Sequence, residues 1–116
     1  MTNIHPLNAL GDPTRRRILE RIRQSPCSVT ELVETVSVSQ PAVSQHLKVL
    51  RDAQLVTVVK HGQKRIYKLN PNGVLELRQY IESLWDDALQ AFEAKAEKMA
   101  NATNNGEYAK KEKSNE

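Results

Sequence analysis

The segment from Ser37 to Asp52 constrains the fold more than any other part of the chain. Its apolar residues Val43, Leu47 and Leu50 recur at helical spacing and predict a helix with one narrow buried stripe. Ser39 is a typical N-cap residue, and the proline two positions later is tolerated in the first turn, where its missing N–H would have no intrahelical partner. The segment therefore predicts a helix that packs on one side only.

The other face of this predicted helix carries short or amide-bearing side chains and no acid. With the cap included, its residues are Ser39, Gln40, Ala42, Ser44, Gln45, His46 and Lys48. Several of them both donate and accept hydrogen bonds, and such a face can bond to base edges in a DNA major groove without repelling phosphate. Taken alone, the stretch is explained equally well as a polar surface helix that happens to lack acids.

Charge is distributed unevenly along the chain. Residues 1–70 hold eleven Lys and Arg against five Asp and Glu, a net of +6, whereas residues 71–116 hold six against nine, a net of −3. A basic front half with a mildly acidic back half suggests a polyanionic partner for the front half only. The charge pattern therefore favours the major-groove interpretation of the helix.

Length and hydropathy limit the classes of protein to which the chain can belong. With 116 residues, of which 39% are hydrophobic, it can form one domain with a small core, which we expect to span residues 1–100. No apolar run approaches the roughly 20 residues that cross a bilayer, and the N-terminus lacks the apolar region of a signal peptide. We therefore expect a cytoplasmic protein without a membrane partner.

Three predicted helices precede the central one. Residues 4–10 form a short amphipathic stretch, and Gly11-Asp12-Pro13 ends one helix and caps a second that runs to about Gln24. Residues 25–27 read as a loop, and Ser28 with Glu31 reads as a capping box that opens a third helix. A tight turn then leads into the central helix. Two short helices joined in this way, the second with a polar face, form a helix-turn-helix.

A β-hairpin is predicted after the helix-turn-helix. Residues 55–60 are rich in β-branched residues, and residues 65–69 alternate in polarity. Residues 61–64 form a four-residue turn with one glycine. Such a hairpin is a wing, and its basic tip suits phosphate contact. We predict that the wing and backbone contacts to DNA are made by Arg16, Lys60, Lys64 and Arg65. The alternative is an edge hairpin whose lysines protect it from aggregation.

A long helix follows, from Asn70-Pro71 to about Ala100. Its broad apolar stripe exceeds what so small a core can cover, and a symmetric homodimer is the commonest way to bury such a surface. We expect a dimer interface formed by the first and last helices through Leu7, Leu10, Ile81, Leu84, Trp85, Ala88 and Phe92. The alternative is that the helix folds back as core. Residues 101–116 are polar and are expected to form a disordered tail.

Three segments resemble the ArsR/SmtB family of bacterial transcriptional repressors: residues 9–20, residues 38–53 and the hairpin that begins at Leu55-Val56. The resemblance covers residues 4 to about 95 and is most specific in Ser44-Gln-His-Leu-Lys-Val-Leu50. It implies a mainly α fold with a small β-hairpin (α+β), a winged helix-turn-helix of four helices, two strands and a final helix. It also implies a homodimer through the first and last helices that binds a palindromic operator, often that of its own promoter.

Many family members release DNA when metal binds, but the residues at the matching positions here differ. The Cys-x-Cys pair of the arsenic- and cadmium-sensing members corresponds to Ser28 and Thr30, and Cys27 lies one residue out of register. Residues 71–100 contain no histidine, whereas the zinc-sensing members carry histidine ligands on the last helix. The resemblance is therefore to the branch without these metal sites. We expect no cofactor, and control by a partner protein, a small molecule or expression level. One alternative is a metal- or small-ligand-responsive repressor with a non-standard site at the dimer interface.

An enzymatic function is not expected. The sequence contains no glycine-rich phosphate loop, no HExxH and no GxSxG, and its single cysteine, Cys27, has no evident base. A second alternative is a winged-helix module that binds protein rather than nucleic acid. The uneven charge and the acid-free helix face argue against that module.

Overall fold

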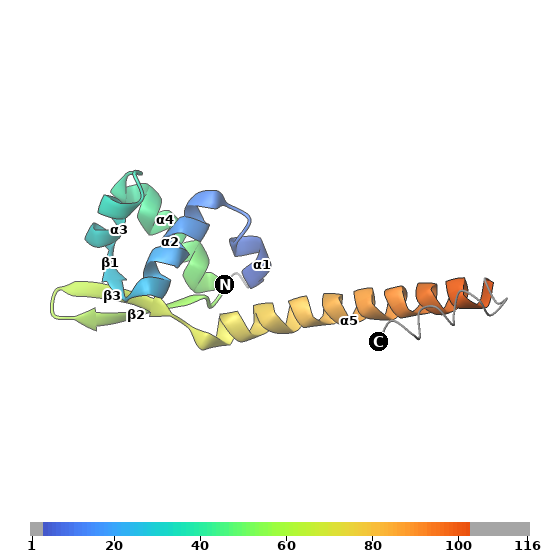
Figure 1. Cartoon of the computed structure of the whole chain (residues 1–116). Helices are drawn as coiled ribbons and strands as arrows, with labels where there is room; N and C mark the ends of the chain where they lie inside the picture. Colours follow the sequence, from blue (N-terminus) through green and yellow to red (C-terminus); the bar gives the residue numbers. More distant parts are fainter. Residues whose placement is uncertain (1–3, 103–116) are drawn as a thin grey trace. The chain divides into compact units, whose positions relative to one another are not determined.

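The computed structural model describes residues 4–102 (Figure 1). Its elements in chain order are α1 (Pro6–Ala9), α2 (Pro13–Gln24), β1 (Cys27–Ser28), α3 (Val29–Thr35), α4 (Gln40–Asp52), β2 (Val56–His61), β3 (Lys64–Leu69) and α5 (Pro71–Ala102). The chain divides into two compact units between Gln79 and Tyr80. The first unit holds α1 to α4, the sheet and the start of α5. The second holds the remainder of α5.

The helices begin at the predicted caps. Oδ1 of Asp12 accepts hydrogen bonds from the backbone N–H groups of Thr14 and Arg15 at the start of α2, at 2.8 and 3.1 Å. Ser28 and Glu31 form the reciprocal capping box of α3. The Ser39 hydroxyl accepts from the third residue of α4, at 3.3 Å. The predicted N-caps of α2, α3 and α4 are therefore confirmed.

The sheet differs from the predicted two-stranded hairpin. It has three antiparallel strands in the order β1-β3-β2 (Figure 1). Cys27 and Val58 both pair with Tyr67. The predicted element order omitted β1 and assigned Cys27 to a loop, which is wrong. A strand of two residues shows no alternation of polarity, and its partner lies far along the chain. The hairpin turn is also shorter than predicted, because His61 pairs with Lys64 and leaves two residues between the strands.

The core lies where α2, α3, α4 and β2 meet. Its largest fully buried side chains, apart from proline and cysteine, are Ile18, Ile22, Leu32, Val36, Val43, Leu47, Leu50 and Leu55. Across residues 4–102, every buried side-chain nitrogen and oxygen has a hydrogen-bond partner. The apolar stripe of α4 is fully buried in this core, so the opposite face of α4 is held toward solvent.

The end of α4 and the start of α5 are joined through a close backbone contact. Gln54, which follows the Ala53 C-cap of α4, adopts a left-handed conformation with φ 60°. The Gly73 N–H donates to the Gln54 carbonyl at 2.9 Å, and the Asn70 N–H donates to the Leu55 carbonyl at the same distance. A Cβ on residue 73 would lie 2.2 Å from the Gln54 oxygen, so only glycine fits there.

In the second unit, residues 80–102 are helical throughout. The large apolar side chains of the predicted stripe are exposed: Ile81 and Leu84 by 51%, Trp85 by 63% and Phe92 by 70%. Helix α5 ends at Ala102, so it passes the predicted domain boundary at residue 100 by two residues. Residues 103–116 of the predicted tail lie outside the described part. None of the helices in residues 4–102 combines the length and hydropathy needed to cross a membrane.

Candidate nucleic-acid interface

Helix α4 presents a polar surface on the side opposite the core. Gln40, Ser44, Gln45 and Lys48 are exposed. The other three residues predicted to contact DNA from this helix and its cap are less available. Ala42 and His46 are half-buried, and the Ser39 hydroxyl is occupied by its capping hydrogen bond. Lys48 forms an exposed ion pair with Asp52 at 3.4 Å, one helical turn later. The structure therefore gathers four amide, hydroxyl or ammonium side chains on one accessible face.

His46 contacts helix α2 through an arginine. Nη1 of Arg15 lies 3.4 Å from Nδ1 of His46. The same guanidinium donates through Nε to the carbonyl of Ala9, at 2.7 Å. Asp12, the N-cap of α2, also interacts electrostatically with His46. One side chain of the polar side of α4 is thus tied to the turn between α1 and α2.

Arg16, which we assigned to the DNA backbone, also bonds to this turn. Its Nη1 donates to the Leu10 carbonyl at 2.7 Å, and the residue remains exposed. Two of the three arginines at the start of α2 thus satisfy carbonyls at the end of α1, where cations are favoured. Helical spacing in the sequence does not reveal that these arginines bind carbonyls of α1, because each carbonyl lies six residues before its arginine. The triplet Arg15-Arg16-Arg17 was the only sequence signal.

The hairpin tip is basic on both strands. The tip joins β2 to β3 (Figure 1). Lys60 and His61 on β2 pair in register with Arg65 and Lys64 on β3, and all four side chains are exposed. Like charges directly opposite each other on a sheet are unfavourable. The pairing therefore concentrates positive charge at the tip at some cost in stability, which suits a surface that meets an anion.

Three side chains in the described part of the first unit have shifted pKa values. The backbone N–H of Arg15 lowers the pKa of Asp12, and the backbone N–H of Ser28 lowers the pKa of Glu31. Both carboxylates are helix-cap groups, and the ionised form accepts these bonds best. Burial raises the pKa of the Cys27 thiol, which is fully buried beside Tyr67. A protonated buried thiol is a poor nucleophile and a poor metal ligand.

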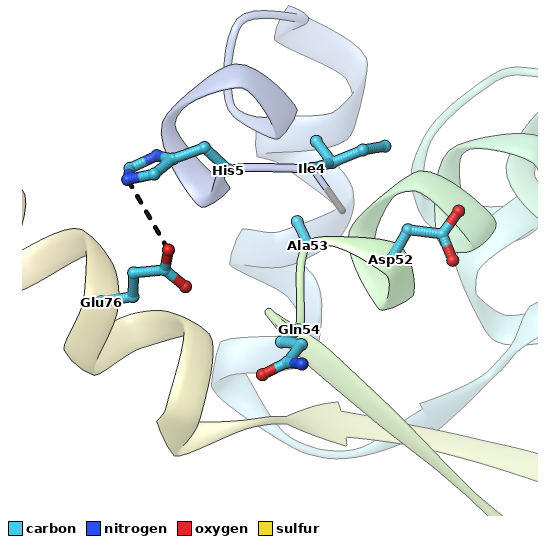
Figure 2. A pocket seen from close by; sticks show the side chains of 6 residues that line it. All are labelled: Ile4, His5, Asp52, Ala53, Gln54 and Glu76. Carbon is cyan, nitrogen blue, oxygen red and sulfur yellow. Dashed lines mark ion pairs between the residues drawn. The ribbon is translucent and has the colours of Figure 1, made fainter. Parts of the chain in front are cut away.

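A polar cavity of about 330 Å³ lies between the start of α1, the end of α4 and the first turns of α5 (Figure 2). It is lined by Ile4, His5, Asp52, Ala53, Gln54 and Glu76. His5 and Glu76 point toward each other, with Nε2 3.9 Å from Oε2, while the Asp52 carboxylate points away from this pair. Within residues 4–102, no three side chains of His, Cys, Asp or Glu are grouped so that they could hold one metal ion.

The three helices α2, α3 and α4 with the β2–β3 hairpin define a winged helix-turn-helix protein, a class that binds DNA. The sequence profile described as bacterial regulatory protein, arsR family, matches residues 12–58. The HTH-type transcriptional regulator Rv2034 of Mycobacterium tuberculosis is 46% identical over 84 residues, which cover 72% of this chain and 78% of that protein. The chain belongs to the ArsR/SmtB family of transcriptional regulators, which are not enzymes.

Other relatives agree with this assignment. The transcriptional repressor SdpR of Bacillus subtilis is 33% identical over 60% of this chain and 76% of its own. Among solved structures, a possible transcriptional regulator for arsenical resistance has a TM-score of 0.67 at 37% identity and covers 79% of this chain and 96% of its own. An ArsR-like transcriptional regulator from Rhodococcus sp. RHA1 has a TM-score of 0.62 at 30% identity, covering 78% of this chain and 88% of its own. DNA binding and transcriptional regulation, as a repressor, follow from the family.

Proposed function

We propose that the protein is a homodimeric repressor that binds a palindromic operator, with α4 in the major groove and the hairpin tip on the phosphates. The observation that carries this proposal is the exposed face of α4, which bears no acid from Gln40 to Lys48, in the same unit as a basic hairpin tip. Amide and hydroxyl groups suit base edges, and ammonium and guanidinium groups suit phosphate. We therefore propose that α4 makes the sequence-specific contacts to bases and that the hairpin tip makes the contacts to phosphates.

Base reading is tested at Gln45. Glutamine is a usual partner of adenine N6 and N7 in the major groove. Changing Gln45 to Ala should weaken operator binding by about 1–3 kcal/mol and leave binding to random duplex almost unchanged. Footprinting on the upstream region of the protein's own gene would supply the operator.

The matched control is Gln24→Ala, which removes the same amide from an exposed position at the end of α2. It should leave both affinities unchanged. An equal loss on operator and random duplex for Gln45→Ala would mean that this face positions the protein without specifying sequence.

Homodimerisation is the proposed way to cover α5. The four large apolar side chains predicted for the interface on this helix, Ile81, Leu84, Trp85 and Phe92, are each at least half exposed, and Leu7 on α1 is exposed by 41%. An apolar stripe of this length is unfavourable in water. We propose that α1 and α5 of two copies bury it around a two-fold axis, which would space the two recognition helices about one DNA turn, or roughly 34 Å, apart.

We also propose that the usual metal sites of the family do not control this protein. Ser28 occupies a position where soft-metal sensors carry cysteine, and its hydroxyl and N–H are both bonded to Glu31. Soft metals prefer thiolates, which Ser28 and Thr30 do not offer. Titrating zinc, cadmium, cobalt and arsenite into the operator complex should therefore release no DNA.

A second candidate, a repressor that responds to a metal or a small ligand through a non-standard site, is favoured by the polar cavity beside His5 and Glu76. The same titration distinguishes the two when it is repeated with a Cys27→Ser, His5→Ala double variant. Release by a micromolar metal in the wild type, abolished in the variant, would support the second candidate and overturn metal-independent control.

A protein-binding module would behave differently from either repressor. Phosphate contacts give a steep fall of duplex affinity with salt, whereas a module that binds only protein would bind no duplex at any salt concentration. We expect the steep dependence.

A further inference from the structure

The contact between Arg15 and His46 constrains the chemistry of the recognition face. Arginine carries only donors, so a hydrogen bond across the 3.4 Å from Nη1 to Nδ1 of His46 needs an unprotonated Nδ1. A neutral imidazole then carries its proton on Nε2. Within residues 4–102, the contact with Arg15 is the one hydrogen bond of the His46 side chain, so its Nε2–H has no hydrogen-bond acceptor in this part of the chain.

We propose that Arg15 is a positioning residue that fixes His46 as an Nε2–H donor, so that His46 reads a hydrogen-bond acceptor in the major groove. This inference rests on the proposed operator binding through α4. The acceptors available in the groove are guanine N7 and O6, adenine N7 and thymine O4. Cytosine offers only its N4 amino donor and would be rejected at this position.

Arg15 is itself held in place, which makes it a suitable support. Its Nε–H bonds the Ala9 carbonyl at 2.7 Å, shorter than the contact to His46, and the side chain is half-buried. A planar guanidinium anchored at Nε has its Nη1 donors in a fixed direction. The orientation of the imidazole is therefore set from α2 and the end of α1 rather than by α4 alone.

Two charged groups, both from α2 and its cap, act on the imidazole of His46. Nη1 of Arg15 lies 3.4 Å from Nδ1, and the Asp12 carboxylate interacts electrostatically with His46. A proton on Nδ1 would face the donors of Arg15 and exclude their hydrogen bond, so the contact with Arg15 selects the tautomer that carries its proton on Nε2.

The tautomer can be measured in the full chain without DNA. Two-bond proton–nitrogen spectra of the imidazoles at pH 7.5 report which ring nitrogen carries the proton. We expect Nε2–H alone at His46 in the wild type and in the control Arg17→Ala, which removes one exposed arginine of the same triplet. Arg15→Ala should give a mixture of tautomers. An Nδ1–H signal in the wild type, or identical spectra in Arg15→Ala and the wild type, would overturn the proposal.

The expected effect of Arg15 on base recognition by His46 is tested by selecting bound sequences from a pool of random 25-base-pair duplexes. Wild type and Arg17→Ala should enrich one consensus, while Arg15→Ala and His46→Ala should relax it at the same base pairs. Arg15→Ala should admit cytosine there and lose about tenfold in affinity for the wild-type consensus, and the double variant should lose no more than His46→Ala alone. Arg15→Lys keeps the charge but has a single nitrogen in place of the guanidinium. It should relax the preference at the same base pairs, and as a conservative variant it separates this effect from loss of folding.

The outcomes separate this inference from the proposed function. Enrichment of no sequence by the wild type would refute operator binding, and the inference with it. A wild-type consensus that Arg15→Ala and Arg15→Lys reproduce unchanged would refute the role of Arg15 and leave operator binding standing.

Discussion

Gly73 provides a test in which local helix propensity and tertiary packing predict opposite signs. Residue 73 lies in the first turn of α5, and replacing a glycine by alanine in a helix ordinarily stabilises it by up to about 1 kcal/mol. Here the added Cβ would lie 2.2 Å from the Gln54 oxygen, 2.5 Å from the Gln54 carbonyl carbon and 2.9 Å from the Ala53 oxygen. All three are backbone atoms, so no side-chain rotation can relieve the overlap.

The magnitude follows from what must move. The segment after α4 has to shift away from α5, which breaks the 2.9 Å hydrogen bond from Gly73 to Gln54 and costs about 1 kcal/mol. Forcing the extra carbon into a packed site costs about 1–3 kcal/mol more. After the gain in helix propensity is subtracted, Gly73→Ala should lower the free energy of unfolding by about 1–3 kcal/mol.

Urea unfolding followed by circular dichroism measures this change, with all variants at one protein concentration because the proposed dimer makes stability concentration-dependent. The matched control is Asn72→Ala, at the exposed neighbouring position of the same turn, which should change stability by no more than about 0.5 kcal/mol. If Gly73→Ala proves as stable as the wild type or more stable, the close approach of the α4 end to α5 is not what requires glycine at this position.

Three further predictions concern the wing, the dimer and a helix cap. Lys64→Ala should weaken binding to all duplexes alike and lower the slope of log affinity against log salt by about 1; an unchanged slope would mean the tip avoids phosphate. Leu84→Glu would bury an unpaired carboxylate and should sediment as a monomer, and a wild type that is already monomeric at micromolar concentration would refute the dimer. The pKa of Glu31 is lowered, chiefly by the Ser28 N–H, so its stabilising effect is present above the unfolded value near 4.5 and is lost as the pH falls through the lower folded value. Glu31→Gln, but not Glu34→Gln, should therefore reduce the loss of stability measured in acid.

Local signals in the sequence were sufficient to predict where the helices α2, α3 and α4 begin and which side of α4 is buried. A cap bonds residues two or three positions away, so Asp12, Ser28 and Ser39 could be assigned from their neighbours alone. The apolar period of α4 likewise predicts its buried side, because helical geometry places Val43, Leu47 and Leu50 on one stripe. The winged helix-turn-helix class followed from the order of these elements, and the family comparisons confirmed it.

Features that join distant segments required the tertiary structure. Strand β1 exists because Cys27 pairs with Tyr67, forty positions away, and two residues carry no pattern of their own. The need for glycine at position 73 comes from the backbone of Gln54, and a helical glycine looks like a weak helix position in the sequence.

The polar side of α4 also combines features that the sequence predicts with features that only the tertiary structure shows. Periodicity identified which residues of α4 face away from the core, since that depends only on the helix. It could not reveal that His46 meets Arg15, because their contact spans 31 positions and depends on how α2 packs against α4. The sequence by itself thus determined the elements and their polar faces, whose causes lie within a few residues. Only the tertiary structure decided which side chains on those faces are supported by a second element, because that support is a contact between segments that the chain order does not bring together.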